Sequence, residues 1–202
     1  SLKQDLKKLG LTEGMTLIVH SALSSLGWIC GGIPTLILAL EESIGEKGTL
    51  VMPAHSGDLS DPAEWSNPPV PESWFDAIRE NMPVFQSDLT PCRGIGQVAE
   101  TFRKQQGVVR SSHPQYSFSA WGKNKDFIIQ DNHYYFAQNE KSPLGRLYEL
   151  NASILLIGVG YCNNTSLHLA EYKADYPAKK FIKNGMPILE NGTRQWRYFD
   201  DI

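Results

Sequence analysis

A strand, a glycine-rich loop, a helix and a second strand follow one another between residues 16 and 52, and this order restricts the possible folds more than any other feature. Thr16–His20 and Thr49–Met52 are short apolar runs, as in buried strands. Between them we expect a helix over Pro34–Ile44, because the fixed φ of proline suits the first helical position. Such a unit favours two parallel strands covered by helices. The chain is therefore predicted to have an α/β fold.

The rest of the chain continues the alternation of helices and strands. Helices are expected over Leu2–Leu9, which Gly10 closes, and over Gly94–Gln106. Further strands are expected at Ser117–Trp121, Ile154–Val159 and Gln195–Phe199.

Residues 53–90 interrupt this alternation. They hold half of the chain's 12 prolines and few periodic runs, and we expect one short helix there, at Pro71–Asn81. A loop of this length in a compact domain usually serves a function. We therefore expect residues 1–202 to form a single three-layer α/β/α domain with a mixed, partly parallel sheet, from which this excursion extends.

The composition favours small-molecule partners over nucleic acids or membranes. With 202 residues, 41% of them hydrophobic, the chain can bury one substantial core. The net charge of −3, from interspersed acids and bases, indicates neither a nucleic-acid nor an anionic-membrane surface. No apolar run approaches the roughly 20 residues of a membrane span, and we expect no signal peptide. Cys30, Cys92 and Cys162 lack metal-type spacing, so reduced thiols in a cytoplasmic protein are expected.

Residues 154–175 carry the strongest chemical signal. An apolar run ends at Gly160 and passes through a polar loop into a helix with His168 and Glu171, which share one helix face at i and i+3. The loop residues Asn163, Asn164 and Thr165 are all good N-caps, so His168 is expected in or near the first turn. There the helix dipole disfavours the imidazolium and keeps the ring neutral, as a general base requires. The alternative is a strand–loop–helix corner in which the histidine only packs or caps.

Four further segments accompany this one: LIVHSALSSLGWICGG at Leu17–Gly32, TPCRGIGQVAE at Thr90–Glu100, RSSHPQYSFSAWG at Arg110–Gly122 and SPLGRLYE at Ser142–Glu149. Together they closely resemble the aminoglycoside 3-N-acetyltransferase family, in the same order from about Leu9 to Tyr198. The resemblance implies a bacterial enzyme that moves an acetyl group from acetyl-coenzyme A to an amine, by direct transfer in a ternary complex. It also implies a fold other than the common N-acetyltransferase fold.

The loop at 21–32 joins a strand to a helix N-terminus, where free N–H groups and the helix dipole favour anions. Its glycines would let a phosphate approach the backbone closely, although a simple turn is the alternative. The resemblance implies that this loop and two others border coenzyme A, at Ser21, Ser24, Ser25, Gly31, Gly32, Arg93, Ser112 and His113. For Arg93 the alternative is a surface salt bridge, and for Ser112 and His113 it is a polar turn. His20 is expected to be structural rather than a base.

An N-acetyltransferase must deprotonate an ammonium, hold the amine near the thioester and stabilise an oxyanion. His168 is the candidate base and Glu171 could orient its ring or bind the cationic acceptor. The family pattern places a third acid in the strand that contains Tyr198, which selects Asp200. Thr165, Ser166 or a backbone N–H could serve the oxyanion.

Carboxylates and aromatics are expected around a polycationic acceptor. The candidates for substrate binding are Thr165, Tyr172, Asp175 and Asp58, with a solvated acidic surface as the alternative. No metal is expected, because HExxH is absent and the histidine spacing matches no site. Cys162 is expected to be a passive thiol.

Two other functions stay open from the sequence: a catalytically idle homologue that binds coenzyme A or another ligand, and a hydrolase that uses Cys162 or a serine. The second is weaker, because no GxSxG elbow is present. Family members continue for several tens of residues past the tyrosine strand, so we expect that this chain lacks a C-terminal segment. The oligomeric state, the acceptor and any drug resistance stay open.

Overall fold

The computed structural model describes all 202 residues. A five-stranded sheet has the order β3-β4-β2-β1-β5, and β6 and β7 form a separate hairpin. The strands are β1 (Thr16–Ser21), β2 (Thr49–Pro53), β3 (Val109–Arg110), β4 (Phe118–Gly122), β5 (Ser153–Ile157), β6 (Ile182–Glu190) and β7 (Thr193–Asp201). The α-helices are α1 (Leu2–Lys8), α2 (Gly32–Ile44), α3 (Phe75–Asn81), α4 (Gly96–Phe102), α5 (Lys125–Ile129), α6 (Pro143–Glu149) and α7 (Ser166–Lys173).

The strand β1 lies between two parallel neighbours. It pairs with β2 on one side and with β5 on the other, in a register that places Ser21 opposite Ile157. The pairing of β2 with β4 is antiparallel, so the sheet is mixed, as predicted. Because β1, β2 and β5 run in the same direction, the chain leaves all three strands at the same edge of the sheet.

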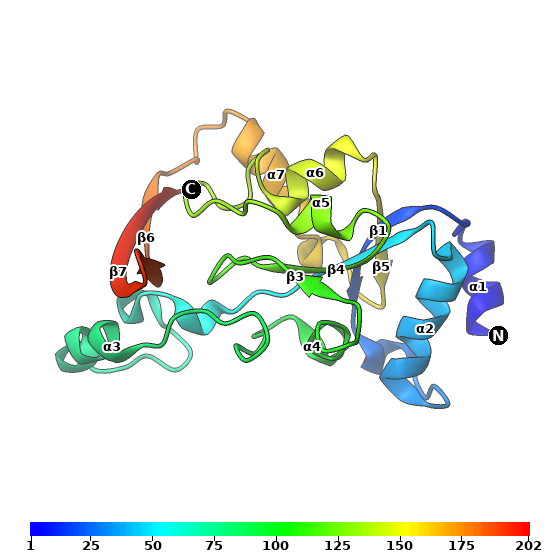
Figure 1. Cartoon of the computed structure of the whole chain (residues 1–202), viewed down its shortest axis with the longest axis horizontal. Helices are drawn as coiled ribbons and strands as arrows, with labels where there is room; N and C mark the ends of the chain where they lie inside the picture. Colours follow the sequence, from blue (N-terminus) through cyan, green and yellow to red (C-terminus); the bar gives the residue numbers. More distant parts are fainter.

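Alternating side chains of β1 and β2 build two cores. Leu17 and Leu50 pack with buried residues of α1, α2 and α4 on one face. Ile18 and Val51 pack with α5, α6 and α7 on the other. Figure 1 shows α2 and α4 below the sheet and α5, α6 and α7 above it. This period-2 burial on both faces confirms the predicted three-layer α/β/α arrangement.

Several boundaries differ from the predictions for local reasons. Helix α2 begins at Gly32, so Pro34 takes the third position; its missing N–H still falls among the unpaired groups of the first turn. Helix α4 begins at Gly96, two residues later than predicted, because Gly94 has a φ of 75°, outside the right-handed helical region. The helix predicted at Pro71–Asn81 is a short 3₁₀ turn followed by α3.

The β6–β7 hairpin was not predicted, apart from part of β7. Its two-residue turn is Asn191–Gly192, with φ of 52° and 76°. Both values lie in the left-handed region that tight hairpin turns require and that Asn-Gly supplies. This dipeptide was a usable sequence signal for a strand before β7 as well.

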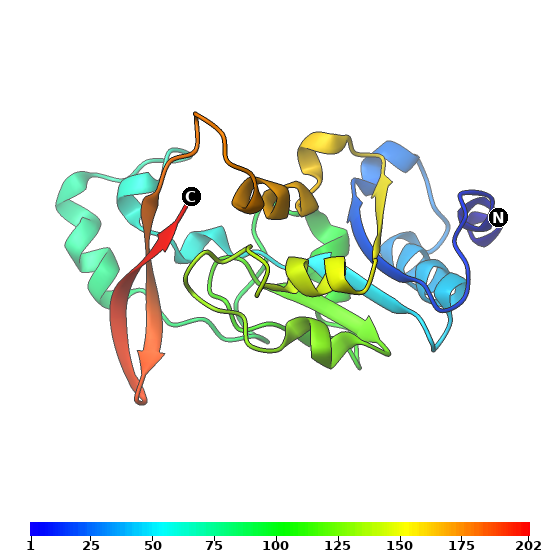
Figure 2. The same cartoon turned by 90° about the horizontal axis from the view of Figure 1, so that it is seen from above.

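The hairpin packs against the excursion of residues 53–90, away from the central sheet (Figure 2). Arg194 donates from Nε to the Met82 carbonyl at 2.8 Å. Tyr198 donates its hydroxyl to Asp61 Oδ2 at 2.8 Å, and Asp61 also binds Arg79. The proline-rich excursion is therefore held in place by the C-terminal hairpin. None of the helices has the length and apolar character needed to cross a membrane.

Replacing Gly158, directly after β5, with alanine should destabilise the protein. Its φ is +68°, and an added Cβ would lie 2.6 Å from Ser25 Cβ and 3.0 Å from the Ala22 carbonyl. We expect Gly158→Ala to lower the free energy of unfolding in urea by about 1–3 kcal/mol. The matched control is Gly160→Ala, because Gly160 has φ of −97° and open space around it. Equal stabilities of the two variants would contradict this account of the contact between the loops.

Candidate functional site

A pocket of about 550 Å³ lies at the edge of the sheet where β1, β2 and β5 end. Four segments line it: Val19–Ser24 after and within β1, Met52–Pro53 of β2, Gly94–Ala99 at the start of α4, and the loop after β5 at Val159, Asn163 and Thr165, with Ile33 of α2 completing the wall. Loops after neighbouring parallel strands meet at one edge, so this is where α/β proteins commonly place ligands.

His168 and Glu171 form the predicted pair in α7, the helix that follows the pocket residue Thr165. Helix α7 follows Thr165, and the Ser166 N–H donates to Asn164 Oδ1 at 3.1 Å. His168 therefore lies in the first turn, as predicted, and its Nδ1 is 2.7 Å from Glu171 Oε2. A carboxylate accepts a hydrogen bond only from a protonated nitrogen, so Nδ1 carries the proton in this pair, and Nε2 has the free lone pair of the neutral ring. Both side chains are about half exposed and accessible to a substrate.

Asp201, not Asp200, lies on the side of α7. The Asp200 carboxylate forms an ion pair with Lys183. Asp201 is 2% exposed, and it accepts hydrogen bonds from the Tyr172 hydroxyl and from Asn184 Nδ2, the latter at 2.7 Å. Burial raises the pKa of Asp201, while its hydrogen bonds and the nearby His168 act in the opposite direction. Successive residues of a strand point to opposite faces, so Asp201 faces α7 and the predicted Asp200 does not.

The serine- and glycine-rich loop contributes part of its predicted set to the pocket. Ser21 and Ser24 line it, whereas Ser25 packs against Gly158. Gly31 and Gly32 stand at the N-terminus of α2 with φ of 80° and 62°, next to the pocket residue Ile33. The loop thus presents hydroxyls and a helix N-terminus at one place, a chemistry that suits anionic groups.

The other predicted cofactor residues lie elsewhere. His113 is completely buried, and its Nδ1 accepts the N–H groups of Gln115 and Tyr116 at 3.1 and 3.0 Å. Burial lowers the pKa of His113 to about 4, so the ring stays neutral in its turn. Ser112 is exposed, but neither residue lines the pocket. The sequence could not show that the His113 imidazole accepts hydrogen bonds from the backbone of its own turn.

Two predicted residues contact each other. Arg93 Nε lies 3.6 Å from Asp58 Oδ1, and both side chains are well exposed. This is the surface salt bridge that was the alternative for Arg93. Asp58 also lines a second, larger and largely apolar pocket of about 660 Å³ within the excursion. No histidine or cysteine lines that pocket.

Three predicted substrate residues, Thr165, Tyr172 and Asp175, lie in α7 or next to one of its ends. Thr165 lines the pocket and precedes α7. Tyr172 is in α7, but its hydroxyl is engaged by Asp201. Asp175 is exposed just beyond the end of α7. His20 lines the pocket at 7% exposure, and burial lowers its pKa to about 4, which makes it a neutral wall residue.

A sequence profile of the family described as aminoglycoside 3-N-acetyltransferase matches residues 18–202. The chain belongs to this family. It is 49% identical over 203 residues to the SPbeta prophage-derived aminoglycoside N(3')-acetyltransferase-like protein YokD of Bacillus subtilis (strain 168), covering all of this chain and 74% of that protein. It is 36% identical to aminoglycoside N(3)-acetyltransferase VII of Streptomyces paromomycinus, of which it covers 69%.

Solved structures of aminoglycoside acetyltransferases share the fold. The crystal structure of YokD matches with a TM-score of 0.95 over 99% of this chain and 74% of that chain. The structure described as AAC-IIIb binary with CoASH matches at 0.86, with 32% identity over all of this chain and 74% of that one. AAC-VIa bound to sisomicin matches at 0.87, with 29% identity over 99% of this chain and 74% of that one. The predicted family and enzyme class are confirmed.

The position of Asp201 in this acetyltransferase can be tested against that of its neighbour. Asp201→Asn leaves a buried amide where a carboxylate accepted three hydrogen bonds, from Tyr172, Asn184 and the Ile202 N–H, so we expect a loss of about 1–3 kcal/mol in the free energy of unfolding. Asp200→Asn removes only a surface ion pair and should stay within about 0.5 kcal/mol of wild type. Urea unfolding of both variants measures the difference. A larger loss for Asp200→Asn would show that the two side chains are exchanged.

Proposed function

We propose that this member of the family transfers the acetyl group of acetyl-coenzyme A directly to an amine of an aminoglycoside or a similar polyamine, with His168 as general base. The observation that carries the proposal is the 2.7 Å contact between His168 Nδ1 and Glu171 in a helix whose first residues adjoin the pocket. Thr165 lines the pocket and is also the N-cap residue of α7, so a short segment of chain connects the pocket to His168.

The pocket walls fit a coenzyme A arm. The N-terminus of α2 and the hydroxyls of Ser21 and Ser24 offer donors to phosphate and amide groups, and Val19, Ile33 and Met52 offer apolar surface. A structural relative at 32% identity is described as a complex with CoASH, which supports the same ligand for this chain.

His168 would act at the acceptor amine. Its Nε2 takes the proton that an ammonium must lose before its nitrogen can attack the thioester carbon. Glu171 stabilises the imidazolium that forms. The attacking nitrogen releases a second proton to solvent as the amide forms, and when the C–S bond breaks the imidazolium returns its own proton to the leaving thiolate. His168 thus acts first as a base and then as an acid.

The oxyanion needs a donor near this base. The Ser166 N–H already donates to Asn164 Oδ1. Thr165 lines the pocket and Ser166 does not, so the Thr165 hydroxyl is the proposed donor. Removing such a donor typically costs about 2.7–4 kcal/mol in the transition state. Asp201 would not contact the substrate. It would hold α7 in position by accepting the hydrogen bond of the Tyr172 hydroxyl.

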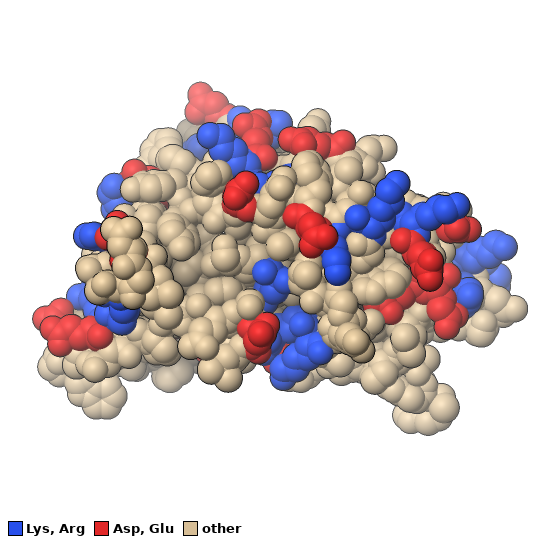
Figure 3. Space-filling view, viewed as in Figure 1, with Lys and Arg blue, Asp and Glu red and all other residues tan.

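Carboxylates at α7 would bind the positive charge of the acceptor. Glu171 and Asp175 are exposed there, whereas Asp58 is paired with Arg93 in the excursion. Figure 3 shows acidic and basic side chains interspersed over one face of the molecule, so we expect local contacts rather than a broad field to select the amine. A structural relative at 29% identity is described as bound to sisomicin, which supports this class of acceptor.

The test is free-thiol release from acetyl-coenzyme A with a panel of aminoglycosides and simple polyamines. We expect release that depends on the amine, and a loss of about 10²–10⁴-fold in kcat for His168→Ala with coenzyme A affinity retained. Cys162→Ser is the control in the loop before α7, because the Cys162 thiol is exposed and donates one hydrogen bond, to Asn163 Oδ1 at 3.4 Å. Its activity should stay near that of wild type.

Three outcomes would contradict the proposal. Full turnover by His168→Ala would remove the base, and an inactive Cys162→Ser would favour a covalent route. Tight coenzyme A binding without amine-dependent release from any acceptor would favour the idle ligand-binding homologue.

A further inference from the structure

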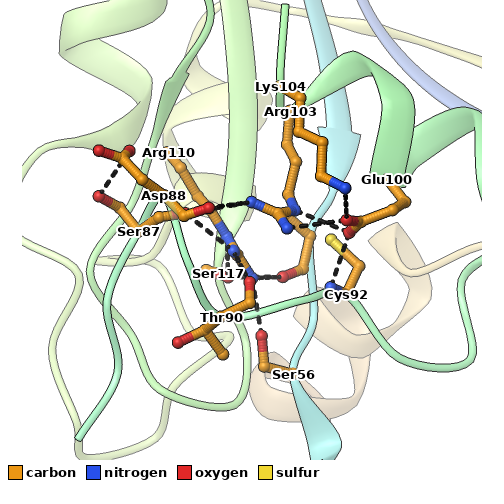
Figure 4. A network of polar contacts seen from close by, with 11 residues as sticks. Ser56, Ser87, Asp88, Thr90, Cys92, Glu100, Arg103, Lys104, Arg110 and Ser117 are labelled. Atoms are coloured by element: carbon orange, nitrogen blue, oxygen red, sulfur yellow. Dashed lines mark hydrogen bonds and ion pairs between the residues drawn. The ribbon is translucent and has the colours of Figure 1, made fainter.

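Arg110, in β3, uses its guanidinium to join three separate segments of the chain (Figure 4). Its Nη2 donates to the Ala54 carbonyl at 2.5 Å and to Ser56 Oγ at 2.7 Å. Its Nη1 donates to the carbonyls of Thr90 at 2.5 Å and Ser87 at 3.0 Å. The remaining group, Nε, donates to Ser117 Oγ at 3.0 Å.

All five acceptors are neutral oxygens, and no carboxylate pairs with Arg110. The guanidinium also lies 4.8 Å from the centre of the Phe85 ring. Burial lowers the pKa of Arg110 to about 10, which leaves it charged at neutral pH. A planar fork with five donors can satisfy carbonyls in several directions at once, and the single ammonium of lysine cannot.

Two of the joined segments continue directly into walls of the pocket at the sheet edge. Ala54 follows Pro53, which lines the pocket from the end of β2. Thr90 precedes the Gly94–Ala99 wall by four residues. The N–H of Arg93 adds one more bond between these segments, to the His55 carbonyl at 2.8 Å.

Arg103 also binds the loop at Ser87–Thr90, but it connects this loop to a different element. It donates to the carbonyls of Ser87 and Asp88 and pairs with Glu100. Arg103 therefore ties the loop to its own helix, α4. Of these two arginines, Arg110 is the one that ties the loop to β2.

We propose that Arg110 is a positioning residue for coenzyme A: it fixes the separation between the end of β2 and the segment before α4, and so sets the width of the cofactor pocket. This inference rests on the proposed function, because it assigns a ligand to that pocket. Arg110 does not need to touch the ligand, since its five hydrogen bonds are already used within the protein.

The experiment compares the dissociation constant of coenzyme A, measured by calorimetry, for wild type, Arg110→Lys and Arg194→Lys. Loss of the fork should weaken binding by about 10- to 100-fold in Arg110→Lys, because a hydrogen bond to a charged group is worth a factor of this size and lysine cannot make all five. Arg194 is the matched control: it also donates to backbone carbonyls, those of Met82 and Arg79, but touches no wall of this pocket. Its lysine variant should bind coenzyme A like wild type.

A second variant covers the case in which Arg110→Lys does not fold. Ser117→Ala removes one acceptor of Arg110 and the Ser117 hydroxyl bond to the Ala54 carbonyl, while the arginine stays. It should weaken binding in the same direction by a smaller factor. Folded variants of Arg110 and Ser117 with wild-type affinity would overturn the inference. Absence of binding by wild type would overturn the proposed function instead, so the two failures are distinguishable.

Discussion

The parallel pairing of β1 with both β2 and β5 is the constraint on which the rest of the structure depends. The apolar residues of β1 and β2 face helices on both sides, so neither strand can shift by one residue without exposing core. Because three strands end at one edge, the serine- and glycine-rich loop, the start of the excursion and the loop before His168 meet there. The contact of Gly158 with Ser25 shows how closely two of these loops pack.

Helix α7, which carries the proposed base, depends on contacts with other parts of the chain. Helix α7 is only eight residues long, and a helix of that length needs tertiary contacts to be stable. Leu169 packs into the core between the sheet and the helices α5 and α6, and Tyr172 donates to Asp201 of the C-terminal hairpin. The hairpin in turn holds the excursion through Arg194 and Tyr198. The orientation of His168 is therefore coupled to segments far from it in the sequence.

The sequence predicted the parts of this arrangement that follow from local patterns. The strands β1, β2, β4 and β5, the helix α2 and the pairing of His168 with Glu171 needed only periodicity, capping and spacing. The sequence did not show which residues of β7 face the interior. Asp200 and Asp201 are adjacent acids, and only the packing of the hairpin decides that Asp201 is the buried one. The burial of His113 and the Arg93–Asp58 pair likewise depend on tertiary contacts. Arg110 looked like any arginine before a polar turn, since its five acceptors come from three distant segments.

The most direct test of the central claim, that function resides where the three parallel strands end, is amide hydrogen exchange with and without coenzyme A. We expect the ligand to slow exchange in residues 21–33, 94–99 and 159–166, which line or adjoin the 550 Å³ pocket. Protection confined to residues 56–91, around the apolar pocket of the excursion, would place the ligand elsewhere and contradict the account.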